Sequence, residues 1–384
     1  MTFSPPKHKN LLAFLFFLTI FMNGFEAGGY QACLLEIGRE FDLSAGSMGL
    51  IASVQLTAIL LAPLLFGALA DSIGKRKVMT AFLLLRTGAC ILLLLTALTR
   101  YFVLGIFLVG LSISILQTVA IAGLEDAYPQ SGRRKLGIIT SMYSLGAVIS
   151  PLLCGFLLES GFSWRILFVL VGSIALFLTF ALYRTDFQPK EPPCAADSLH
   201  SARGSWNFTG ILVLCFIMFI YVGVESGFSF FLTSFMQLEL SGGANSYLAL
   251  SMFWLAMIPS RLLCGWLHQH RALLLLSAAI GVTLLAAWMS IIQIPYAAIL
   301  MSFCLGFFSG AVYPSVLNYS VDFSGSRTAT ATGMITAATG LGGAIIAALF
   351  GWITELYDIR TAFDILAAFM SLDILAALWL IRRH

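Results

Sequence analysis

Two glutamates, Glu26 and Glu225, lie inside long apolar stretches of the chain, where a charged side chain is costly. They occupy similar strings, GFEAG at 24–28 and GVESG at 223–227. A carboxylate at bilayer depth has to face a wet cavity or carry a proton, so each glutamate is a candidate for binding a polar solute or a transported proton. Glu225 is the first choice as coupling residue and Glu26 the second. The alternative is that they hydrogen-bond to backbone or tyrosine and only fix helix packing.

Further polar and aromatic side chains in the apolar stretches are candidates for contact with a solute. Amides donate and accept hydrogen bonds, and aromatic rings stack on the apolar face of a small molecule. The predicted solute-binding set comprises Asn23, Glu26, Gln31, Gln117, Tyr221, Glu225, Trp254, Tyr313 and Asn318. Aromatic residues at helical spacing are more often packing residues, and this alternative stays open. Arg86 and Arg261 are expected near helix ends, with their guanidinium groups reaching water.

The composition identifies the elements that must position these residues. Of 384 residues, 59% are hydrophobic and 10% charged, which excludes an ordinary soluble protein. About 20 apolar residues in a helix cross the hydrocarbon layer, because the backbone must satisfy its own hydrogen bonds there. An all-α membrane protein with twelve transmembrane helices is predicted, over residues 11–37, 45–69, 78–98, 101–125, 136–158, 163–184, 208–237, 245–267, 272–292, 295–320, 329–354 and 361–381.

The chain divides in the middle into two similar halves. Residues 185–207 are polar and Pro-rich, which predicts a cytoplasmic linker between a six-helix bundle at 1–184 and another at 208–384. The two glutamate strings recur 199 residues apart, and Asp126 and Asp322 recur 196 apart. Such a repeat predicts two pseudo-symmetric bundles with a solute site between them near the bilayer midplane.

The basic residues predict the orientation. With a cytoplasmic N-terminus, the inner segments carry fifteen Lys and Arg residues and the outer loops four. Because cytoplasmic loops are enriched in Lys and Arg, both termini are predicted to be cytoplasmic in a multi-pass protein of the plasma membrane, or the inner membrane if the source is bacterial.

The segment after the second predicted helix reads GALADSIGKRK over 67–77. It resembles the G-x-L-a-D-x-x-G-r-k signature of the major facilitator superfamily, and the twelve helices, the linker and the two halves extend that resemblance over the whole chain. In that family the loop acts as a gate latch. The resemblance therefore implies the gating residues Gly67, Asp71, Gly74 and Arg76.

Strings in the second half are similar to the fucose–galactose–glucose permease branch, whose members are sugar:cation symporters. These are YVGVE at 221–225, FWLAM at 253–257 and the stretch from Gly306 to Pro314. The two acidic positions of the fucose permease fall on Gln31 and Gln117, which cannot carry a proton. A competing string, GAVISPLLCG at 146–155, is similar to drug:proton antiporters.

These observations predict a secondary active transporter that moves a small polar, sugar-like solute by alternating access, coupled to a proton or another cation. The alternative is a proton-antiport exporter of amphipathic compounds. No enzyme signature is present, and the chain is expected to need no cofactor or metal. The expected partners are the solute, the coupling ion and the lipid bilayer, with no nucleic acid, and the protein is expected to be a monomer.

Overall fold

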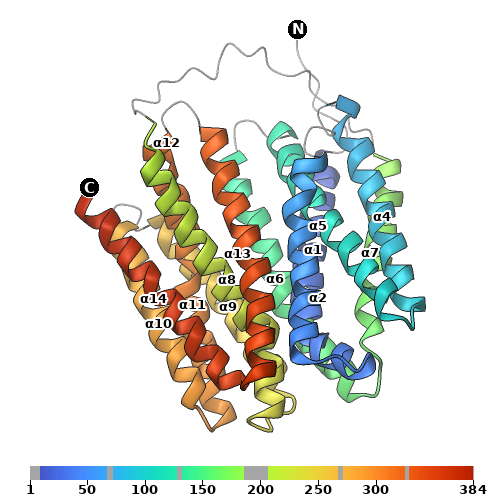
Figure 1. Cartoon of the computed structure of the whole chain (residues 1–384). Helices are drawn as coiled ribbons and strands as arrows, with labels where there is room; N and C mark the ends of the chain where they lie inside the picture. The colour runs from blue at the N-terminus through green and yellow to red at the C-terminus, as the bar shows by residue number, and fades with distance from the viewer. Residues whose placement is uncertain are drawn as a thin grey trace. The chain divides into compact units, whose positions relative to one another are not determined.

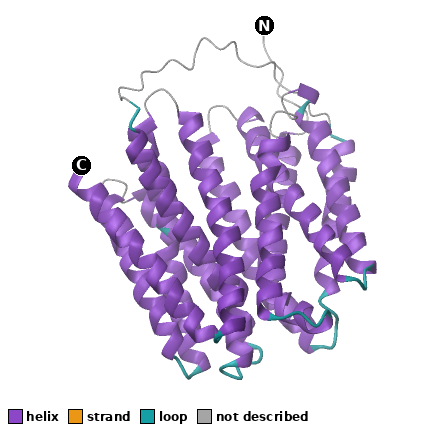
Figure 2. Ribbon diagram, in the orientation of Figure 1, coloured by secondary structure: helices purple, strands orange, loops and turns teal. Residues whose placement is uncertain are grey.

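A computed structural model of the chain describes residues 9–66, 72–127, 132–185, 206–266, 271–324 and 328–383. These residues form helices joined by short turns, with no strand among them (Figure 2). The helices are α1 Lys9–Glu40, α2 Ala45–Phe66, α4 Lys75–Leu95, α5 Thr99–Ala127, α6 Gly132–Glu159, α7 Arg165–Tyr183, α8 Phe208–Leu238, α9 Asn245–Trp266, α10 Arg271–Ile291, α11 Pro295–Gly310, α12 Val312–Ser324, α13 Thr328–Leu356 and α14 Ile359–Arg383.

Twelve spans in the described part of the chain are long and apolar enough to cross a bilayer, as the sequence predicts. Thirteen helices supply them because α11 and α12 together make the span from 295 to 324. The break between these two helices falls at Ala311. Pro314 explains it, because proline lacks an N–H and its ring clashes with the carbonyl four residues earlier, here that of Gly310.

By contacts between Cα positions the chain forms two compact units. Unit 1 contains residues 1–30 and 58–198, and unit 2 contains residues 31–57 and 199–384. In unit 1, α4 packs against α5 and α7. In unit 2, α8 packs against α13, α9 against α11, and α10 against α14 (Figure 1). The predicted linker lies outside the described residues from 186 to 205.

The internal repeat is visible in helix packing within each unit. A Cβ atom added to Gly146 of α6 would lie 2.3 Å from the carbonyl oxygen of Phe21 on α1. A Cβ atom added to Gly342 of α13 would lie 1.9 Å from the carbonyl oxygen of Phe219 on α8. Only glycine allows backbones to approach this closely. Both units thus use a glycine in equivalent places to bring equivalent helices together.

Polar contacts at the helix ends repeat as well. Lys75 Nζ donates to the Ala122 carbonyl at 3.3 Å in unit 1, and Arg271 Nη1 donates to the Asn318 carbonyl at 3.1 Å in unit 2. Both partners of the second pair lie 196 residues after those of the first. The repeat predicted from the sequence is therefore present in backbone packing and in the contacts that tie helix ends together.

At the opposite ends of the helices, two arginines make another equivalent pair of contacts. Arg165, at the start of α7, donates to the Thr96 carbonyl at 2.9 Å. Arg360, at the start of α14, donates to the Ile292 carbonyl at 2.8 Å. Each arginine holds the beginning of one helix to the end of another in its own unit.

Candidate functional site

Unit 1 contains a fully buried polar cluster built from three helices. Asn23 and Glu26 come from α1, Arg86 from α4 and Ser112 from α5, and all four side chains are 0% exposed. Arg86 Nε donates to Ser112 Oγ at 2.6 Å, and Nη2 donates to Asn23 Oδ1 at 3.1 Å. Asn23 Nδ2 in turn donates to the Ile113 carbonyl at 3.0 Å. This network connects α1, α4 and α5 around a cation.

Glu26 is the carboxylate that interacts electrostatically with Arg86. An arginine does not release its proton in a protein, so a guanidinium without access to water needs a negative group close by. The cluster therefore places a carboxyl group within electrostatic range of a buried guanidinium that donates two hydrogen bonds. Its hydrogen bonds connect α1, α4 and α5, and its four side chains are fully buried.

The expectation that Arg86 reaches water from a helix end is wrong. Arg86 is the twelfth residue of α4, which begins at Lys75, and therefore lies near the middle of that helix. The sequence contained a signal for this burial, since Asn23 and Ser112 also stand in apolar stretches at mid-span. A buried arginine requires such hydrogen-bonding partners.

Unit 2 contains a second cluster, which is more open. The Tyr221 hydroxyl hydrogen-bonds to the Glu225 carboxylate one turn further along α8. Arg261 of α9 interacts electrostatically with Glu225, and also with Tyr313 of α12. Glu225 and Arg261 are half-buried, and Tyr313 is 40% exposed. Tyr221 is buried. These four residues, called the Glu225 cluster below, combine acidic, basic and phenolic groups.

Other predicted residues lie elsewhere in the units. Trp254 of α9 donates its indole N–H to Gln31 Oε1 at 3.0 Å, and both side chains are buried in unit 2. Gln117 on α5 is half-buried in unit 1. Asn318 is exposed, and its backbone carbonyl accepts the hydrogen bond from Arg271. Within the described part of the chain, neither Gln117 nor Asn318 has a hydrogen bond to another predicted solute-binding residue.

The predicted gate segment is described only in part. Gly67 and Asp71 lie outside the described residues. Gly74 precedes α4 with a φ angle of 95°, a conformation that favours glycine, and a Cβ atom there would meet no atom within 4 Å. Arg76 Nη2 donates to the Tyr183 carbonyl at 2.7 Å, which connects the start of α4 to the end of α7.

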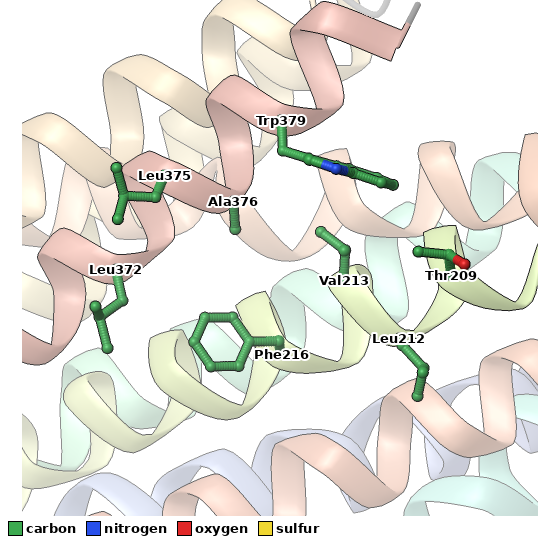
Figure 3. Close-up of a pocket in the computed structure, with 8 residues that line it drawn as sticks. All are labelled: Thr209, Leu212, Val213, Phe216, Leu372, Leu375, Ala376 and Trp379. Atoms are coloured by element: carbon green, nitrogen blue, oxygen red, sulfur yellow. The ribbon is translucent and has the colours of Figure 1, made fainter.

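An apolar groove lies between α8 and α14 of unit 2 (Figure 3). It contains none of the predicted site residues, and its only polar groups are a threonine hydroxyl and an indole N–H. Its lining residues are Thr209, Leu212, Val213, Phe216, Leu372, Leu375, Ala376 and Trp379. In the part of the chain that the structure describes, no three His, Cys, Asp or Glu residues come together as a metal site would require.

Comparisons with known proteins match this architecture. The family model described as Major Facilitator Superfamily matches residues 16–336 and 271–384. The glucose/mannose transporter GlcP of Bacillus subtilis (strain 168) is 23% identical over 357 residues, covering 89% of this chain and 87% of that protein. The multidrug resistance protein MdtM of Salmonella typhimurium is 31% identical over 147 residues, covering 38% of this chain and 35% of that protein.

A solved structure, a mutant of the nucleoside transporter NupG, is similar with a TM-score of 0.79. The alignment covers 96% of this chain and 99% of that chain at 14% identity. At this identity the likeness shows a shared fold.

Proposed function

The chain belongs to the Major Facilitator Superfamily and is a membrane transporter of small-molecule solutes rather than an enzyme, and we propose that its solute is a small, hydroxylated, sugar-like molecule. The observation that carries this proposal is the Glu225 cluster. Its carboxylate accepts hydrogen bonds, its guanidinium donates them, and its two phenols do both. A molecule with several hydroxyl groups satisfies such a mixed set.

The similarity to GlcP supports this solute class, because it extends over almost the whole chain and both halves. The exposed ring of Tyr313, a member of the cluster, offers a face on which the C–H side of a sugar ring can stack. We also propose that Gln31, Gln117, Trp254 and Asn318 contribute hydrogen bonds to the solute in other states of the cycle. Transport then proceeds by alternating access of a central site.

Glu225 is the residue we propose for coupling to a proton or cation. It is less buried than Glu26, and its neighbours Tyr221 and Arg261 can exchange contacts with it as a solute binds. Glu26 is the second candidate for the coupling residue on the basis of the sequence. Its full burial beside Arg86 supports a role in holding α1, α4 and α5 together instead.

A second candidate function is proton-antiport export of amphipathic compounds. The match to MdtM favours it, because the 31% identity there is higher than that to GlcP. However, that match covers 38% of this chain. The polar character of the Glu225 cluster supports the sugar-like solute as the first choice.

Orientation and gating follow as further parts of the proposal. We infer that both termini are cytoplasmic in the plasma membrane, on the strength of the fifteen-to-four distribution of Lys and Arg. We also infer that Asp71 and Gly67 form a cytoplasmic gate latch with Gly74 and Arg76. A reporter fused after residue 384 is expected to read cytoplasmic, and one at 160–161 external.

The solute class is tested by thermal unfolding of the purified protein with hexoses, hexose alcohols, organic acids and amphipathic cations. A ligand raises the apparent stability by RT ln(1 + [L]/Kd), whichever direction it is transported. A shift with hexoses that is lost in Tyr313→Ala supports the proposal. Shifts with amphipathic cations alone would favour the exporter instead.

A further inference from the structure

The apolar groove between α8 and α14 has two chemically different ends (Figure 3). At one end lie Thr209, in the first turn of α8, and Trp379, about one turn before the end of α14. The other end is lined by Phe216 and Leu372, which carry no polar side-chain atom. From residue 209 to 216 the groove extends roughly 10 Å along α8 at 1.5 Å per residue.

The walls of the groove are apolar side chains at the surface of unit 2. Leu212 is 46% exposed, Phe216 43% and Leu375 65%, and all three lie within membrane spans. Such side chains contact hydrocarbon when the helices cross a bilayer. The groove narrows to the smaller side chains of Val213 and Ala376 between these walls. Its shape and chemistry therefore fit an acyl chain lying along the two helices.

A basic side chain stands beside the polar end. Arg382 follows Trp379 by three residues, so the two are neighbours on the surface of α14, and Arg382 is exposed. The Thr209 side chain is exposed as well. None of the eight residues that line the groove is acidic. The polar end thus combines a positive charge with a hydroxyl group, which together suit a phosphate group.

This order of groups matches one end of a phospholipid in a membrane. Tryptophan prefers the level of the lipid headgroups, and basic side chains at the cytoplasmic side attract the anionic lipids of the inner leaflet. Residues 186–205, which precede α8, are polar and Pro-rich, so their composition does not match the apolar walls. A lipid is the occupant that fits both the apolar walls and the charged end.

Unit 1 carries bulkier side chains at the equivalent positions. Phe14 of α1 precedes Val213 by 199 residues, the offset of the two glutamate strings. Phe180 of α7 precedes Leu375 by 195 residues, the offset of the arginines that begin α7 and α14. The guanidinium of Arg184 lies over the Phe180 ring, 4.2 Å from its centroid. Unit 2 has smaller side chains at these places, which leaves room for a ligand.

We propose that this groove binds one anionic glycerophospholipid, with an acyl chain between α8 and α14 and its phosphate at Arg382 and Thr209. The guanidinium donates charge-assisted hydrogen bonds to phosphate oxygens, and the apolar walls remove the chain from the mobile bilayer. Placement of the lipid in the inner leaflet rests on the proposed orientation of the termini. Binding itself depends neither on that orientation nor on the solute.

The test is native mass spectrometry of the full-length protein released from detergent, after titration with dioleoylphosphatidylglycerol or with zwitterionic dioleoylphosphatidylcholine. Arg382→Gln removes the charge at the polar end. The double variant Val213→Phe with Leu375→Phe gives the groove the side chains of unit 1. Two matched controls change exposed residues away from the groove: Lys77→Gln in the first turn of α4, and Leu284→Phe on α10.

Wild type and both controls are expected to bind one phosphatidylglycerol more tightly than phosphatidylcholine. Arg382→Gln is expected to weaken phosphatidylglycerol binding about fivefold, the factor for one basic side chain near an anionic surface, and to leave phosphatidylcholine binding unchanged. The double phenylalanine variant is expected to lose this site for both lipids. Should that variant fold poorly, Arg382→Gln still decides the question, because it changes only an exposed helix end.

Equal binding of phosphatidylglycerol by wild type, Arg382→Gln and the double phenylalanine variant would overturn the site. The same spectra report the oligomeric state. A dimer in wild type that the double phenylalanine variant converts to monomers, without a change in bound lipid, would assign the groove to a second copy of the chain and also overturn the proposal.

Discussion

In unit 1, the glutamate of the GFEAG string is fully buried near Arg86, whose guanidinium donates hydrogen bonds to side chains of α1 and α5. In unit 2, the glutamate of the GVESG string is half-buried beside a tyrosine and a partly exposed arginine. The two strings occupy equivalent places in the repeat, on helices that a glycine in each unit brings into close contact with a partner helix. The difference between the clusters therefore arises from their neighbours and not from the backbone.

The arginines show how the neighbours diverged. Arg86 stands on α4 in unit 1, whereas Arg261 stands on α9 in unit 2, and the position 196 residues after Arg86, the offset that relates Lys75 to Arg271, is Val282. The repeat thus preserves helix packing but places the positive charge on a different helix in each half. One glutamate is fully buried in unit 1, and the other is half-buried in unit 2.

The largest effect is expected from removing one member of the buried pair. Arg86→Met or Glu26→Gln alone leaves an uncompensated buried charge, which typically costs about 3–5 kcal/mol. The double variant Arg86→Met with Glu26→Gln has no charge left at this place and is expected to regain most of the stability. Thermal unfolding of the four proteins in detergent measures this cycle.

The double variant is also expected to keep its coupled transport, because we propose that coupling depends on Glu225 and not on this pair. If each single variant were as stable as wild type, the pair would not contribute to the stability of the fold. If the double variant were stable but transported its solute without coupling, Glu26 would be needed for coupling.

A smaller and equal effect is expected from the two packing glycines. Gly146→Leu in unit 1 and Gly342→Leu in unit 2 each force a side chain against a backbone carbonyl that cannot move aside. Overpacking of this kind costs about 1–3 kcal/mol. Similar losses in the two variants, measured by thermal unfolding, would show that the halves share their packing. A loss of stability in only one of the two variants would show that the two units repeat in sequence but do not depend on the same glycine packing.

The smallest effect is expected at the start of α14, outside the membrane spans. Asp358 accepts hydrogen bonds from the Thr361 backbone N–H at 2.7 Å and from its hydroxyl at 2.9 Å. These bonds, the backbone N–H foremost, lower the pKa of Asp358 below its usual value. Their stabilisation is present above the unfolded pKa of about 4 and is lost as the pH falls through the lower folded value.

Asp358→Ala is therefore expected to cost about 0.5 kcal/mol at neutral pH, the low end for a helix cap because the carboxylate is exposed. The difference from wild type should shrink below about pH 4. Melting curves of both proteins across this range measure it. The equivalent position in unit 1 is Ser163, so Asp358→Ser, with a neutral cap, is a matched control whose stability should not follow the carboxyl titration. A difference that stays constant with pH would show that the carboxylate charge does not contribute.

The twelve spans, the repeat and the two intramembrane glutamates could be predicted from the sequence, because each depends on local hydropathy or on a recurring string. The partners of the glutamates could not. The position of Arg86 within its helix can be read from the sequence, but which helix faces it depends on how α1, α4 and α5 pack. The same holds for Glu355 and Ser44, whose segments are far apart in the chain and meet only through the packing of α2 on α13.

Uphill accumulation of a solute in proteoliposomes with an imposed pH gradient tests the central difference between the two clusters most directly. The solute is the hexose that gives the largest thermal shift. Glu225→Gln keeps the shape and a hydrogen-bond acceptor but cannot titrate. The variant is expected to lose accumulation while retaining exchange of labelled for unlabelled hexose, whereas the Arg86→Met, Glu26→Gln double variant accumulates like wild type. Undiminished, pH-dependent accumulation by Glu225→Gln would contradict the assignment of coupling to unit 2.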